Sequence, residues 1–247
     1  MVSAWASANG VVLDQRKVDG ESNEITAVPE LLDALEIAGC IVTLDAIHCQ
    51  TETVETMVDK GADYILRVKE NQPRPLEALQ GLFDDPAEMR WVECDHHKTV
   101  DEGHGRVEIH ECWSTSDPEY LNYIATLAEW RGLQSIAMVQ AERQLGDQRT
   151  VARRCFISTL KSDAERLLQA VRGHCGIENQ AHWVLDIAFR EDDCRIRKGN
   201  GAENSAVLRH IALNLLKRET LAERRSLKGK RKKAAWDEEY LLKVLTG

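Results

Sequence analysis

Residues 172–197 read RGHCGIENQAHWVLDIAFREDDCRIR, and the rest of the chain is organised around this stretch. Residues four apart lie on one face of an α-helix, so the spacing predicts one polar stripe, made of His174, Glu178, His182 and Asp186. An apolar stripe beside it predicts the face that packs inward, made of Ile177, Ala181, Val184, Leu185 and Ala188. A carboxylate beside a buried stripe can be held firmly, although charge on a helix is more often only a solvated surface.

The composition is that of a globular protein of the cell interior. With 247 residues and 43% hydrophobic content, the chain can bury a sizeable core. Its seven cysteines are scattered and never spaced C-x-x-C, which argues against a disulfide framework and a structural zinc site and favours a reducing cytoplasm. The sequence contains neither an apolar run long enough to span a bilayer nor a secretory leader, so we expect a soluble protein without membrane contact.

Charge is segregated along the chain. The formal net charge is -9, yet residues 217–233 hold nine basic residues against two acidic ones. A basic segment on an acidic body suits contact with DNA phosphates, because their neutralisation releases counterions. The same pattern is typical of a solvated tail, and at this point both interpretations stay open.

The N-terminal third predicts an α/β core. Residues 1–7 and 11–18 predict two strands joined at Asn9-Gly10, and residues 24–37 predict a core-facing helix that ends before Gly39. Residues 40–44 and 64–68 are short buried strands on either side of a helix at residues 51–60. This order implies parallel pairing with a right-handed connection.

Two polar residues stand at the carboxyl ends of these buried strands. Functional groups gather at such strand ends in open α/β sheets, and Asp45 and Lys69 both fall there. The simpler alternative for Asp45 is that its side chain caps the helix that follows.

The middle of the chain changes character. Residues 107–113, 135–140 and 151–157 alternate or cluster apolar residues as strands do, which predicts a β-rich insertion. His104, Gly105 and Arg106 form a tight turn that could present an imidazole and a guanidinium, or simply be surface. We therefore divide the chain into a first core part (1–89), the β-rich insertion (90–160), a second core part with the Glu178 helix (161–216) and a basic C-terminal tail (217–247).

A series of short motifs occurs in order along the chain: Ser22-Asn23-Glu24-Ile25, Leu44-Asp45-Ala46, Cys49-Gln50, Val68-Lys69, Asn71-Gln72, His104-Gly105-Arg106 with Glu108, Arg172-x-His174, Ile177-Glu178-Asn179, His182-Trp183-Val184-Leu185-Asp186 and Glu191-Asp192. Together they closely resemble the ISAs-type, H-repeat-associated family of insertion-sequence transposases, over nearly the whole chain to about Lys217. The resemblance implies an α/β fold, a ribonuclease H-like mixed sheet flanked by helices, with a β-rich insertion before the last catalytic helix. It also implies a DDE carboxylate triad in which Asp45 is the second acid and Glu178 the third.

The implied activity is Mg²⁺- or Mn²⁺-dependent cleavage of insertion-element ends and their transfer to target DNA. Phosphodiester transfer needs an activated nucleophile, an oxygen leaving in line and compensation of charge, which two cations about 4 Å apart can supply. Asp45 and Glu178 would be both catalytic acids and metal ligands, so we expect their carboxyl groups within about 10 Å of each other. The spacing of His174 and His182 around Glu178 is not the H-E-x-x-H of a zinc protease.

Polar and mostly basic residues in turns and at element ends are expected to line the DNA path: Lys69, Asn71, His104, Arg106, His174, His182, Arg195, Arg197 and Lys198. The expected partners are double-stranded DNA, at element ends and target, and further copies of the chain in an active homo-oligomer. The expected location is the cytoplasm, in association with the nucleoid.

Two alternative functions stay open. One is a metal-dependent nuclease on the same fold, which would hydrolyse DNA without joining strands. The other is a non-catalytic DNA-binding remnant of a transposase, which would keep salt-dependent DNA binding without Mg²⁺-dependent cleavage.

The chain departs from the family pattern in two places. Cys175 stands where the family usually has tryptophan. The family's first catalytic aspartate lies on a strand upstream of residues 1–7, and neither Asp14 nor Asp19 matches it, which predicts an N-terminally truncated domain. In the implied strand order 3-2-1-4-5, that strand lies between residues 1–7 and the strand ending at Asp45. We therefore expect the isolated chain to be poorly soluble or to pair these two strands directly, and to lack Mg²⁺-dependent cleavage.

Overall fold

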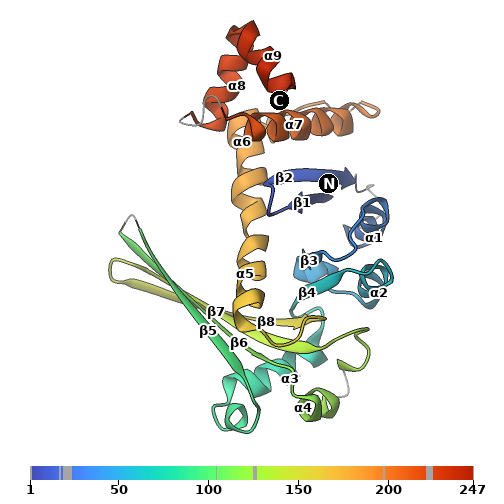
Figure 1. Cartoon of the computed structure of the whole chain (residues 1–247), viewed down its shortest axis with the longest axis vertical. Helices are drawn as coiled ribbons and strands as arrows, with labels where there is room; N and C mark the ends of the chain where they lie inside the picture. The colour runs from blue at the N-terminus through green and yellow to red at the C-terminus, as the bar shows by residue number, and fades with distance from the viewer. Residues whose placement is uncertain are drawn as a thin grey trace. The chain divides into compact units, whose positions relative to one another are not determined.

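The computed structural model describes the backbone of residues 2–16, 18, 24–103, 105–124, 127–196, 198–220 and 225–246, and most of their side chains. The chain divides into two compact units, one formed by Met1–Ala27 with Gly173–Gly247 and the other by Val28–Arg172. Helices and strands both contribute, as Figure 1 shows, so the α/β class predicted from the sequence is confirmed. None of the helices in these described ranges is long and apolar enough to cross a bilayer.

The Val28–Arg172 unit contains a six-stranded mixed sheet. Its strands, in sheet order, are β3 (Ile41–Leu44), β4 (Asp63–Val68), β8 (Gln148–Ser158), β7 (Ser135–Leu145), β6 (Arg106–Thr115) and β5 (Asp95–Gly103). β3 and β4 are parallel, as the strand–helix–strand pattern predicts, and α2 (Thr51–Asp59) connects them. β8 pairs antiparallel with β4, so the β-rich segment continues the core sheet instead of forming a separate layer.

Helices pack against both faces of this sheet. On one face α5 (Ala164–His174) buries Leu167, Leu168 and Val171 against Cys112 of β6 and Val139 of β7. On the other face α3 (Pro73–Asp84) contacts β7 and β8, and its Leu79 and Leu82 are fully buried. Most of α1 (Glu24–Ala34), the helix predicted at residues 24–37, also lies in this unit. Three shorter elements are the 3₁₀ turns η1 (Ala46–His48) and η2 (Glu88–Arg90), and α4 (Pro118–Tyr123).

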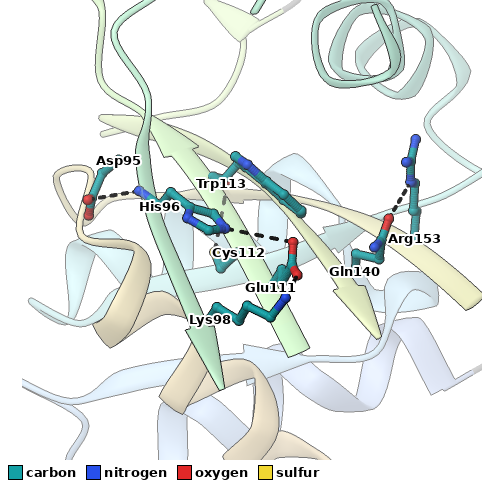
Figure 2. Close-up of polar contacts among 8 residues, drawn as sticks. All are labelled: Asp95, His96, Lys98, Glu111, Cys112, Trp113, Gln140 and Arg153. Carbon is teal, nitrogen blue, oxygen red and sulfur yellow. Dashed lines mark hydrogen bonds and ion pairs between the residues drawn. The ribbon is translucent and has the colours of Figure 1, made fainter. Parts of the chain in front are cut away.

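Side chains opposite the α5 face form a polar row across the long strands. Neighbouring residues of a strand point to opposite faces, so Glu111 and Gln140 face away from α5. Lys98 Nζ lies 2.6 Å from Glu111 Oε1, and Arg153 Nε donates to Gln140 Oε1 at 2.9 Å. Figure 2 shows both contacts. These four residues are successive cross-strand partners from β5 to β8. Cross-strand pairs of this kind stabilise the sheet register.

The other unit begins with the predicted hairpin, β1 (Val2–Ala6) and β2 (Val11–Arg16). Gly10 closes its turn with φ +64°, a conformation that glycine adopts without strain. The Asn214 side chain of α7 (Gly201–Arg218) accepts from the Val12 amide at 2.9 Å and donates to the Val12 carbonyl at 2.7 Å. The hairpin is therefore held to α7 by two hydrogen bonds between the Asn214 side chain and the Val12 main chain, as well as by apolar contact.

The segment predicted to be a basic tail is helical wherever the structure describes it. α7 runs through Lys217, and α8 (Leu227–Trp236) and α9 (Glu238–Thr246) follow it side by side (Figure 1). Lys230, in the middle of the basic run, is 7% exposed and donates to the carbonyls of Leu216 and Glu219. At Lys230 the basic run is therefore part of the packed structure of this unit.

The direct strand pairing that we expected as one outcome does not occur among the described strands. β1 has β2 as its ladder partner, and β3 has β4. The alternative outcome, poor solubility of the isolated chain, stays a prediction, as do the four domain boundaries.

Candidate functional site

Asp45 stands at the carboxyl end of β3, immediately before the 3₁₀ turn η1. Its backbone is extended, with φ -61° and ψ 152°, and its side chain makes no hydrogen bond that caps the turn. The residue is exposed. The capping role considered from the sequence is therefore wrong, and the carboxylate is presented at the edge where strand ends gather.

Two amide side chains from the loop after β4 fasten the loop that carries Asp45. Asn71 Nδ2 donates to the Ala46 carbonyl at 2.9 Å, and Gln72 Nε2 donates to the Cys49 carbonyl at 3.0 Å. Cys49 itself is fully buried, and burial raises the pKa of its thiol to about 12. The Asn71-Gln72 motif thus has a structural use that its sequence did not reveal: it holds the turn after β3 beside the loop after β4.

Lys69 is exposed at the carboxyl end of β4, as predicted. It lies at a cavity of about 100 Å³ whose other charged lining residues are Arg67, Arg153, Arg154, Glu70 and Asp84. Arg153 donates to Asp84 at 2.7 Å. The cations outnumber the acids, so the electrostatic character of the cavity suits an anionic group.

The turn between β5 and β6 supplies one described candidate. Arg106 is exposed at the first position of β6, and its Nε lies 3.1 Å from Glu108 Oε1. His104 lies outside the described residues. The joint presentation of an imidazole and a guanidinium therefore stays a prediction.

Glu178 begins a π-helical segment, η4 (Glu178–His182), between α5 and α6 (Trp183–Phe189). The predicted continuous stripe with a spacing of four is wrong, because α5 ends at His174 and π-helical bonds join residues five apart. The interruption falls between Gly173 and Gly176, and glycine is a poor helix former. π-Helical turns often occur at functional sites. The structure describes the backbone but not the side chain of Glu178.

The apolar face of this segment is confirmed and explains what holds Glu178 in place. Ala181 and Leu185 are each 1% exposed, and they pack with Val12 of β2 and Leu213 of α7. The segment therefore has a rigid support within its own unit.

The remaining candidates of this unit lie at or beyond element ends. His174 is half-buried at the end of α5, while His182, Arg195 and Lys198 are exposed. Burial, with a smaller effect of His182, lowers the pKa of His210. Arg197 lies outside the described residues.

The structure therefore groups Asp45, Lys69, Asn71 and Arg106 in one unit and Glu178, His174, His182, Arg195 and Lys198 in the other. The approach of Asp45 to Glu178 stays a prediction.

The donor chemistry at Asp45 fits a hard cation better than a soft one. No three His, Cys, Asp or Glu side chains in the described part of the chain come together as a metal site. Asp45 offers exposed carboxylate oxygens, which suit Mg²⁺, whereas the nearby Cys49 is buried and holds its proton. Glu178 offers the same type of donor.

Comparison with known proteins adds independent information. The model of a family described as "Transposase DDE domain" matches residues 1–215. Over 253 residues the chain is 38% identical to "H repeat-associated putative transposase YhhI" and to "Putative protein YbfL", both of Escherichia coli strain K12, covering 100% of this chain and 65% of each relative. It is also 38% identical over 249 residues to "Putative transposase YncI" of Escherichia coli O157:H7, covering 99% of the chain and 63% of that protein. The chain therefore spans about two thirds of the length of these relatives.

Proposed function

Since this chain belongs to the transposase DDE domain family, we propose that it carries two of the acids with which a DNA transposase binds Mg²⁺ or Mn²⁺, Asp45 and Glu178. The mixed α/β architecture, with its six-stranded sheet flanked by helices, is consistent with the ribonuclease H-like fold of such enzymes. The proposed reaction is cleavage of phosphodiesters at element ends and their transfer to target DNA.

The observation that carries the proposal is the setting of Asp45. Its carboxylate is exposed at the end of a parallel strand, and the turn behind it is fastened by Asn71 and Gln72. A carboxylate that binds a metal ion next to a phosphate needs such a fixed backbone, because small displacements of a catalytic group lower the reaction rate by large factors. The family match at residues 1–215 includes both acids.

The chain's own residues would have two roles, metal binding and attraction of DNA phosphates. Asp45 and Glu178 would hold the cations through carboxylate oxygens. Divalent cations bound there supply activation of the attacking oxygen and neutralisation of charge at the phosphorus. Lys69 and the arginines around its cavity would attract DNA phosphates by charge.

The wider assignments belong to the same proposal. The partner is double-stranded DNA, contacted by Lys69, His104, Arg106, His174, His182, Arg195, Arg197 and Lys198. Asn71, whose amide donates to the Ala46 carbonyl, would contribute through the loop that it holds. The active form would be a homo-oligomer working in the cytoplasm on the nucleoid.

The test is loss of metal-dependent chemistry on removal of each acid. Asp45→Asn and Glu178→Gln keep side-chain size and remove the charge, and Glu55→Gln, exposed in α2, is the matched control. The assay measures Mg²⁺-dependent cleavage and strand transfer on labelled element-end DNA, with this chain and with a form extended to the length of its relatives. We expect each acid variant to lower the activity of either form by about 10³-fold, because several kcal/mol of charge stabilisation are lost.

A second readout does not depend on turnover. Mn²⁺ should broaden the NMR signals of amides around Asp45, and Asp45→Asn should remove that broadening while Glu55→Gln keeps it. Hydrolysis without strand joining would favour the nuclease alternative. Salt-dependent DNA binding with neither broadening nor cleavage would favour the DNA-binding remnant.

A further inference from the structure

Lys217 occupies an unusual position for a lysine. It lies in the last turn of α7, is half-buried, and holds its Nζ 4.1 Å from the centroid of the Trp5 ring in β1. The ammonium therefore lies over the face of the indole, the side that attracts a cation. Both residues belong to the unit formed by Met1–Ala27 and Gly173–Gly247.

The described side chains that meet this ammonium at the hairpin turn are uncharged. A methyl group built on Gly10 would lie 3.8 Å from Lys217 Nζ, 3.8 Å from Gln180 Oε1 and 3.9 Å from Trp5 Cζ2. The three side chains thus converge on the hairpin turn that precedes β2. No described carboxylate lies within ion-pair distance of Lys217, in contrast to Lys230, whose Nζ lies 3.4 Å from Glu219 Oε2.

A half-buried cation of this kind is costly unless a partner compensates it. Burial lowers the pKa of Lys217 to about 8, which reports the missing hydration of the charged form. The cation–π contact with Trp5 offsets only part of this lost hydration. An anion bound beside Lys217 would therefore restore the stabilisation that the ammonium loses on burial.

The location indicates which anion would meet it. Gln180 is the third residue of the π-helical segment that Glu178 begins, so the site belongs to the same local structure as that acid. Gln180 also places Nε2 on the side of Gly176, and a half-turn of the amide would present this donor to a ligand beside Lys217.

We propose that Lys217 and Gln180, beside the turn at Gly10, bind one phosphate group of a DNA strand next to the segment that carries Glu178. The choice of DNA as the source of the phosphate rests on the proposed function. The ammonium supplies the charge, the indole of Trp5 holds it in place, and the glycine turn leaves room for a sugar–phosphate backbone. Lys217 acts in binding and not as an acid or base.

The first test measures the salt dependence of DNA binding by the full chain. Each phosphate neutralised by a lysine adds about 0.9 to the slope of log affinity against log salt. We expect Lys217→Gln to decrease the magnitude of this slope by about one and Lys217→Arg to leave the slope unchanged. Lys161→Gln, which removes an exposed charge in the other unit, should leave the slope unchanged. Thermal melts of all variants check that each is folded.

The second test observes the ammonium directly. In protein carrying ¹³C-labelled lysine, the ε-carbon of Lys217 should titrate apart from the ordinary lysines, and Lys217→Arg identifies its signal. A short DNA duplex should move this titration to higher pH, because bound phosphate stabilises the charged form. Trp5→Leu should weaken the response while the lysine remains.

Each outcome decides the proposal. An unchanged salt slope in a folded Lys217→Gln variant overturns the site, as does a titration that DNA does not move. A response to inorganic phosphate without a response to the duplex overturns DNA as the source. Neither test uses metal or cleavage. A Lys217 response with no metal effect at Asp45 would therefore refute the catalytic proposal and leave phosphate binding standing, and the opposite result would do the reverse.

Discussion

In both the loop after β3 and the end of α7, side chains donate hydrogen bonds to main-chain carbonyls, but the donors differ. At the loop, the neutral amides of Asn71 and Gln72 donate to Ala46 and Cys49. At the helix end, the charged Lys230 donates to Leu216 and Glu219 and also faces the Glu219 carboxylate. The first arrangement is at the exposed edge of the sheet, whereas Lys230 and Glu219 are buried.

The difference indicates what each region is for. A buried ion pair is costly to break, because the remaining charge has no water to replace its partner. Such a network ties α7, α8 and α9 into one unit, and Tyr240 of α9 completes it by donating to Glu219 at 2.6 Å. Neutral amide bonds near the surface contribute less stability but define position. They suit a loop that must present Asp45 accurately.

Removing Lys230 should have the largest effect. Lys230→Met keeps the aliphatic stem but leaves the buried Glu219 carboxylate without its cation, which should lower the free energy of unfolding by about 3–5 kcal/mol. Lys232→Met, two residues away and exposed, is the control and should change it by less than about 0.5 kcal/mol. Urea titration measures both. Equal effects of the two variants would contradict the distinction between a structural lysine and a surface lysine.

Tyr240→Phe should have an intermediate effect that depends on pH. Loss of the hydrogen bond to Glu219 should cost about 1.5–3 kcal/mol at neutral pH. Burial, with the bond to Glu219, raises the pKa of Tyr240 to about 12, against about 10 in an unfolded chain. The folded state therefore favours the protonated phenol, so this stabilisation is complete below about pH 10 and is lost as pH rises to about 12.

The measurement is the difference in unfolding free energy between the native chain and Tyr240→Phe as a function of pH. It should be constant up to about pH 10 and shrink above it. A difference that grows with alkaline pH would show that the sign, and hence the role of the phenol as donor, is wrong.

Asn71→Ala should have the smallest effect on stability and the most local one. Losing one neutral hydrogen bond to Ala46 should cost about 0.5–1.5 kcal/mol. Hydrogen exchange of the Cys49 amide, which donates to the Ala46 carbonyl at 3.1 Å, should accelerate because the turn loosens. Asn122→Ala, exposed in α4, is the control. Unchanged exchange at Cys49 would refute the view that Asn71 positions the Asp45 loop.

Much of the core could be predicted because its signals are local. Asn9-Gly10 predicts the first hairpin, and the helix predicted at residues 51–60 is α2, which ends just before Gly61 at φ +71°. The parallel pairing of β3 and β4 follows from two short apolar runs separated by one helix. The placement of Asp45 at a strand end follows from the same pattern, since it requires only the strand boundary.

β5 is a strand that local sequence patterns do not predict. Its sequence, DHHKTVDEG, contains one apolar residue and no alternation, so nothing in it predicts a strand. It forms because every one of its residues has a partner on β6 and because an edge strand needs no apolar face of its own. The continuity of the sheet through β8 and β4 is likewise a property of long-range pairing.

The amino-acid sequence by itself determined the α/β class and the strand end on which Asp45 stands, because residue type and short-range periodicity are sufficient for these. The tertiary structure decided which lysines are buried, since the run KGKRKK at residues 228–233 looks the same at every position while only the fold brings Glu219 to Lys230. It also brought Lys217 over Trp5 and made the Glu178 segment π-helical. Desolvation and long-range contact depend on residues far apart in the chain, and no local pattern records them.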